Sequence, residues 1–130
     1  MRTWIKICAT TCVEDALASI EAGADALGFV FAPSKRQVSA GRAQGIVEQL
    51  PGRIERIGVF SNESAERVTQ VAEQVGLTGV QLHGEETAAF IDEMKAKLSP
   101  HHKCGVIKTV LVNDHFEERF AEVCADYDCI

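Results

Sequence analysis

The chain has 130 residues, of which 46% are hydrophobic and 25% are charged, a balance typical of one globular domain rather than of a disordered or collagen-like protein. We therefore expect a single domain over residues 1–130. Nineteen acidic residues against thirteen basic ones give a formal net charge of -6, which disfavours binding to nucleic acid or to an anionic membrane surface.

Membrane insertion and secretion are also disfavoured by the sequence. The longest apolar stretch, residues 26–33, is shorter than the run of about 18 residues that spans a bilayer. Charged residues interrupt residues 1–25, which therefore lack the pattern of a signal peptide. The five cysteines form no disulfide framework and are interpreted as thiols in a reducing compartment, so we expect a cytoplasmic protein.

An apolar stretch at residues 4–9 predicts the first strand, and a helix is expected to follow it directly. Thr11 has Glu14 three positions later, which is the spacing of a capping box, so we expect the helix to open there. Gly23 follows the last apolar position of this helix and suits the left-handed conformation in which many helices end.

The same order of an apolar strand and an amphipathic helix repeats along the rest of the chain. The further strands are expected at residues 26–31, 56–60, 79–83, 106–112 and 127–130. The further helices are expected at residues 40–50, 64–75, 86–98 and 115–125. Gly76 is expected to end the third of the five helices as Gly23 ends the first.

Strict alternation of strands and helices predicts an α/β fold with parallel strands and right-handed crossovers. Two closures fit this pattern, a (β/α)8 barrel or an open, doubly wound sheet of the flavodoxin type. A barrel needs eight strands and roughly 200 residues or more, whereas this chain supplies about five and a half βα units. We therefore expect an incomplete barrel, an open sheet, or a dimer that exchanges strands through its exposed edges.

Ligands of parallel βα proteins bind at the carboxyl ends of the strands, so polar residues at those positions are candidates for a site. These residues are Cys8, Arg36, Gln81, His83 and Asp114. No glycine-rich phosphate motif of the Rossmann or P-loop type occurs, and the sequence therefore supports no nucleotide cofactor. No cofactor of another kind is predicted.

Cys8 has two interpretations from the residues alone. It ends the first strand beside Lys6 and precedes a helix, whose amino terminus would favour the thiolate form of a general base. Its alternative role is that of a small buried hydrophobic residue, which is the commoner state of cysteine. A zinc site with the other histidines and cysteines is disfavoured because paired CxxC spacing is absent. The residues of that alternative are Cys8, Cys12, His101, His102 and Cys104.

The other candidates also have structural alternatives. Arg36 could hold a carboxylate through its planar guanidinium, or it could be a solvated loop residue. His83 could reach a ligand or satisfy a buried carbonyl. Asp114 has Glu117 three positions later, so we expect Asp114 to cap the following helix rather than to act in chemistry.

An ordered set of short motifs resembles the N-terminal part of the phosphoribosylanthranilate isomerase family of tryptophan biosynthesis, from Lys6 to the end of the chain. The motifs are KIC (6–8), EDA (14–16), GADALGFVF (23–31), SKR (34–36), GVF (58–60) and VQLHG (80–84). The resemblance implies a (β/α)8 barrel that rearranges N-(5-phosphoribosyl)anthranilate, an aminoaldose, into an aminoketose. The small-molecule substrate would be the partner, without nucleic acid or membrane.

The resemblance also assigns roles to residues. Cys8 matches the base that removes the C2 proton, Arg36 matches the arginine that contacts the anthranilate part, and Gln81 and His83 match residues that line the site. Two departures stand out. The family has a glycine where this chain has Ala9, and the aspartate that serves as general acid ends a sixth strand just beyond Ile130.

Without that acid and the phosphate loops after strands seven and eight, the resemblance implies that this chain is nearly or wholly inactive alone. Two rivals remain open at this point. One is a non-catalytic half-barrel that forms a homodimer or docks a partner through its exposed strand edges. The other is a different phosphate-binding barrel enzyme, which would need a carboxylate of this chain facing Cys8.

Overall fold

The computed structural model describes residues 1–126, with the side chains of residues 1–122. Its strands are β1 (Lys6–Ile7), β2 (Ala26–Val30), β3 (Glu55–Phe60), β4 (Gly79–Leu82) and β5 (Gly105–Lys108). Its helices are α1 (Val13–Glu21), α2 (Ala40–Val47), α3 (Ala65–Val75), α4 (Ala88–Lys97) and α5 (Phe116–Asp126). The predicted order of elements is thus confirmed for this part of the chain, and the strand expected at 127–130 lies outside the described residues.

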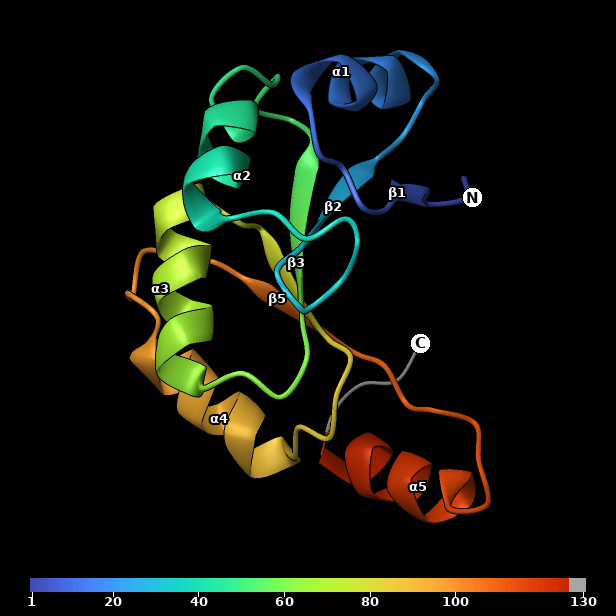
Figure 1. Cartoon of the computed structure of the whole chain (residues 1–130). Coiled ribbons are helices and arrows are strands. Elements are labelled where there is room, and N and C mark those ends of the chain that lie inside the picture. The colour runs from blue at the N-terminus through green and yellow to red at the C-terminus, as the bar shows by residue number, and fades with distance from the viewer. Residues whose placement is uncertain (127–130) are drawn as a thin grey trace.

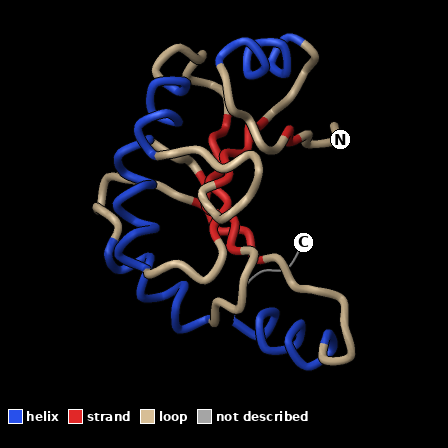
Figure 2. Tube along the Cα trace, in the orientation of Figure 1, coloured by secondary structure: helices blue, strands red, loops and turns tan. Residues whose placement is uncertain are grey.

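The strands form one parallel sheet whose spatial order, β1-β2-β3-β4-β5, is also the order of the chain. Figures 1 and 2 show α2, α3 and α4 stacked along one side of a curved column of strands, with α1 and α5 at its two ends. A flavodoxin-type sheet has the order 2-1-3-4-5 and helices on both faces. The open doubly wound alternative is therefore wrong, and the structure is an arc of a singly wound barrel.

The hydrophobic core lies between the helices and the outer face of the sheet. Alternate residues of the central strands point into it, among them Phe29, Phe60 and Val80. Helix α3 contributes Val68, Val71, Ala72 and Val75, which are all buried, as their helical spacing predicts. Among the described helices, none is long and apolar enough to cross a membrane.

The helix ends show which capping predictions hold. Gly23 and Gly76 both adopt positive φ angles, +98° and +73°, and end α1 and α3 as predicted. After α1 the N–H groups of Gly23 and Ala24 donate to the carbonyls of Ile20 and Ser19, the bonds of a Schellman motif.

Two predicted capping boxes are wrong because the helices begin later than expected. Helix α1 begins at Val13 with Cys12 as its N-cap, which leaves Thr11 outside the capping position. Helix α5 begins at Phe116, two residues beyond Asp114, and the side chain of Asn113 accepts the N–H of His115. The strand ends also differ from prediction, since β1 is shorter than residues 4–9 and β5 ends at Lys108 rather than at residue 112.

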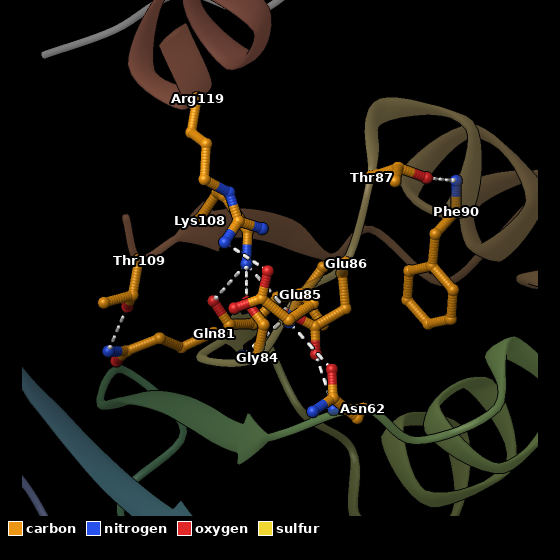
Figure 3. Close-up of polar contacts among 11 residues, drawn as sticks. Asn62, Gln81, Gly84, Glu85, Glu86, Thr87, Phe90, Lys108, Thr109 and Arg119 are labelled. Atoms are coloured by element: carbon orange, nitrogen blue, oxygen red, sulfur yellow. Dashed lines mark hydrogen bonds and ion pairs between the residues drawn. The ribbon is translucent and has the colours of Figure 1, made fainter. Parts of the chain in front are cut away.

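A buried ion pair holds the loops at the carboxyl ends of β3, β4 and β5 together (Figure 3). Lys108 Nζ of β5 lies 2.9 Å from Glu86 Oε1, and both side chains are less than one-tenth exposed. The other carboxylate oxygen, Oε2, accepts the N–H of Asn62 at 2.8 Å, and Oε1 also accepts the N–H of Gly84 at 2.9 Å. One carboxylate thereby links three successive strand ends.

The backbone around this ion pair is closely packed and tolerates few substitutions. Asn62 has a positive φ of 52°, and its Oδ1 accepts the N–H of Glu85 at 2.7 Å. A Cβ atom added to Gly84 would come within 2.7 Å of the Asn62 backbone nitrogen, so only glycine fits there. Glu85 also forms an ion pair with Arg119, which ties α5 to the same loop.

Glu86 remains ionised because of its partners. Burial, the strongest single influence, raises its pKa, but the hydrogen bonds from Lys108 and from backbone N–H groups, together with the charge of Lys108, outweigh it. The net result is a pKa below the usual value of 4.5. A carboxylate whose pKa is lower in the folded than in the unfolded chain stabilises the fold at every pH above the unfolded-state pKa. This stabilisation is lost as the pH falls through the folded-state pKa.

We predict that Glu86→Gln lowers the free energy of unfolding at pH 7 by about 3–5 kcal/mol, because it leaves the buried Lys108 ammonium unpaired. The variant should also lose less stability than the parent chain on acidification below pH 4.5, since the titrating carboxylate is gone. Urea unfolding at a series of pH values measures both effects. Glu93→Gln, which removes an exposed partner of Lys97, is the control and should change stability by less than about 1 kcal/mol. Equal losses in the two variants would contradict the role given to Glu86.

Candidate active site

The sheet brings four of the five predicted site residues to its carboxyl rim. Cys8 follows β1 and is exposed, Arg36 lies exposed in the loop between β2 and α2, and His83 is exposed directly after β4. Gln81 lies within β4 and is half-buried. Asp114 lies apart from β5 in the exposed loop before α5.

Cys8 lies on the inner face of the sheet, opposite the helices. Lys6 pairs in register with Ala26, and alternation along the strands puts Cys8 and Gly28 on that same face. A Cβ atom added to Gly28 would lie 2.8 Å from Cys8 Sγ and 3.1 Å from Cys8 Cα. The absence of a side chain at Gly28 therefore leaves the space that Cys8 occupies.

A chain of polar side chains crosses the inner face beside Cys8. Lys6 Nζ donates to Gln81 Oε1, and Gln81 Nε2 donates to Thr109 Oγ1 at 3.1 Å. Lys6 Nζ also lies 3.9 Å from Cys8 Sγ. In a flat sheet β1 and β4 would lie about 14 Å apart, too far for Lys6 to meet Gln81, so this contact depends on the curvature of the sheet.

The backbone turns sharply after Cys8. Ala9 has a φ of 65°, in the left-handed region that glycine adopts readily and alanine rarely. The next residue, Thr10, is buried and donates its N–H to the Gly28 carbonyl at 2.9 Å. The position at which the resemblance implies a glycine is thus one where the backbone favours glycine.

Arg36 and Cys8 line one open hollow, together with Ala9 and Thr10. At the base of the loop that carries Arg36, the Val38 N–H donates to the Val30 carbonyl at 2.9 Å. Asp15 of α1 supplies the one carboxylate among the described residues that line this hollow. Other lining residues include Ile7 of β1 with Ala18 and Ser19 of α1, so the hollow runs along the free edge of β1, and Lys6 is not part of its lining.

The exposed thiol of Cys8 contrasts with that of Cys104, which is half-buried. Burial raises the pKa of Cys104 to about 11, so that thiol stays protonated near neutral pH. Among the described residues, no group of three histidine, cysteine, aspartate or glutamate side chains is placed to hold a metal ion. Sequence reasoning missed Thr109 and the close contact between Gly28 and Cys8, since neither residue carries a recognisable motif for that contact.

Comparison with known proteins shows which family this chain resembles. The family model for N-(5'-phosphoribosyl)anthranilate (PRA) isomerase matches residues 5–129. The N-(5'-phosphoribosyl)anthranilate isomerase of Thermotoga neapolitana is 45% identical over 118 residues, which are 90% of this chain and 55% of that protein. The isomerase of Bacillus cereus is 54% identical over 82 residues, which are 63% of this chain and 41% of that protein.

Solved structures agree with the sequence comparison. A phosphoribosyl anthranilate isomerase in complex with reduced 1-(o-carboxyphenylamino)-1-deoxyribulose 5-phosphate superimposes with a TM-score of 0.83 and 42% identity, over 94% of this chain and 61% of that one. The enzyme of Thermotoga maritima gives a TM-score of 0.82 and 42% identity, over 94% of this chain and 58% of that one. The chain thus spans about half of its sequence relatives, and it belongs to the N-(5'-phosphoribosyl)anthranilate isomerase family.

Proposed function

We propose that this chain forms the N-terminal part of an active site for the Amadori rearrangement of N-(5'-phosphoribosyl)anthranilate, with Cys8 as the general base. The observation that carries the proposal is the place of the Cys8 sulfur, on the inner face over Gly28 and 3.9 Å from the Lys6 ammonium. A thiol exposed at a strand end can reach a substrate, and a neighbouring cation favours the thiolate that abstracts a proton.

The chemistry assigned to Cys8 is a single proton transfer. When the sugar ring is open, C1 is joined to the anthranilate nitrogen as a protonated Schiff base. The Cys8 thiolate takes the proton from C2, the C2–H electron pair forms the C1=C2 bond, and the former C1=N pair returns to nitrogen. The enolamine that results then becomes the aminoketose by tautomerisation.

Arg36 is proposed to hold the substrate carboxylate. It lines the same hollow as Cys8, and its planar guanidinium suits a bidentate contact with a carboxylate. The ligand in the related crystal structure contains a carboxyphenyl group, which is consistent with such a contact. His83 and Gln81 remain predicted to line the substrate site.

The general acid is proposed to come from outside the present residues. The resemblance places it at the end of a sixth strand, just beyond Ile130. Loss of a general acid costs about 10² to 10⁴ in rate. Binding should be weaker as well, because the phosphate loops of such barrels follow strands seven and eight.

The isomerase assay, which follows the loss of substrate fluorescence, tests these assignments. We expect the 130-residue chain alone to show little or no turnover, and turnover to appear when the C-terminal βα units of the Thermotoga neapolitana relative, which this chain does not match, are fused to it. Cys8→Ala should abolish that turnover. Arg36→Met should raise KM about tenfold, the effect of losing a carboxylate contact, whereas Lys35→Met in the same loop should not.

Two results of this assay would contradict the proposal. Turnover that survives Cys8→Ala would exclude Cys8 as the base. Turnover by the chain alone that vanishes in Cys8→Ala would show that the acid lies within these residues, and Asp15→Asn would then test the carboxylate that lines the Cys8 hollow.

We predict that Ala9→Gly raises the free energy of unfolding by about 0.5–1 kcal/mol, since glycine tolerates the φ of 65° without strain. Denaturant unfolding measures the change. Ala18→Gly, at an exposed position within α1, is the matched control and should lower stability by about 1 kcal/mol. A loss of stability in both variants would mean that the backbone after Cys8 is not strained.

One observation supports the second candidate role, that of a docking or dimerisation module. Apolar side chains are exposed at both ends of the sheet, including Ile7 of β1 at 43% and Leu111 after β5 at 51%. The pairing of two copies through these edges stays a prediction, as does a cytoplasmic location.

A further inference from the structure

The inner face contains one charged side chain that is tethered beside the candidate base. Lys6 is partly buried, and its ammonium donates to Gln81 Oε1 while lying 3.9 Å from Cys8 Sγ. A free lysine has four rotatable bonds and spreads its charge over many positions. A lysine held at its end keeps its charge at one position.

Gln81 is fixed at both ends of its amide. Its oxygen accepts from Lys6 of β1, and its Nε2 donates to Thr109 Oγ1 at 3.1 Å, just after β5. Because oxygen and nitrogen each have a partner, the amide has one orientation, with its acceptor toward Lys6. Thr109 in turn is placed by its backbone, since its N–H donates to the Leu82 carbonyl at 2.9 Å.

We propose that Lys6 is a positioning residue for Cys8, clamped by Gln81 and Thr109 so that its ammonium stabilises the anionic sulfur. The inference rests on the proposed function of Cys8 as a base, and it gives Gln81 a role other than direct contact with substrate. Gln81 of β4 and Thr109, just after β5, would then tune the reactivity of the residue that follows β1, and these side chains meet because the sheet curves.

Any test must distinguish the effect of Lys6 on Cys8 from the effects of other charged groups near Cys8. Arg36 and Asp15 line the hollow that Cys8 also lines, and they carry opposite charges. Neither has a hydrogen bond or ion pair to Lys6 or Cys8 among the described contacts. Arg36→Met therefore serves as a control for a second cation.

The test measures alkylation of each cysteine at pH 7 in the 130-residue chain, resolved by peptide mass spectrometry. Iodoacetamide is neutral and reports the thiolate, whereas iodoacetate is anionic and also reports a cation beside the sulfur. We expect Lys6→Met to slow the alkylation of Cys8 at least about fivefold, the effect of a unit charge about 4 Å away in water. The ratio of iodoacetate to iodoacetamide rates should fall as well.

Matched variants make the result specific. Lys6→Arg should restore most of the rate by restoring the charge, and Gln81→Leu should slow Cys8 by a smaller factor because it releases the lysine. Cys12 serves as an internal reference, and its rate should not change. Lys35→Met, at an exposed lysine beside Arg36, should leave both cysteines unaffected.

The inference is overturned if Lys6→Met leaves the Cys8 rate and the reagent ratio unchanged, or if Cys12 slows by the same factor. It is also overturned if Arg36→Met alone reproduces the whole effect. These outcomes are independent of the turnover assay of the fused enzyme, in which the survival of turnover in Cys8→Ala would exclude Cys8 as the base.

Discussion

The arrangement of the sheet and its helices depends on one constraint, the right-handed connection between neighbouring parallel strands. Because the strands follow one another in space in the order of the chain, each crossover places its helix on the same face of the sheet. The outer face gains a continuous hydrophobic core, and the inner face carries both apolar side chains, such as Ile57 and Val59, and the polar contact of Lys6 with Gln81. Curvature of the sheet then brings Lys6 of β1 to Gln81 of β4.

Glycine and alanine shape the inner face around the thiol. Gly28 leaves space for the Cys8 sulfur, and the positive φ of Ala9 turns the chain away from the strand end directly after it. The Glu86–Lys108 pair fixes the neighbouring loops from the outer side of the same rim. A single rim thus combines the buried ion pair with the exposed thiol of Cys8, the proposed base.

The sequence predicts the order and type of the elements because apolar periodicity and helix-ending glycines such as Gly76 are local signals. The choice between a barrel and an open sheet could not be made from periodicity, since both use the same local pattern. The Thr11 and Asp114 caps were predicted wrongly because a capping box depends on where the helix begins, to the residue. The contacts of Gln81 with Lys6 and Thr109 join residues that are far apart in the sequence, and no short motif encodes a contact of that kind.

The central claim is that the carboxyl rim of this sheet is a substrate-binding surface. Titration of the ¹⁵N-labelled chain with reduced 1-(o-carboxyphenylamino)-1-deoxyribulose 5-phosphate, the ligand of the related crystal structure, tests it directly by NMR. We predict that the largest amide shifts fall at Ala9, Arg36 and His83, at the carboxyl ends of β1, β2 and β4. Shifts confined to Gly23, Arg53 and Thr78, which precede strands, or none at millimolar ligand, would contradict the account.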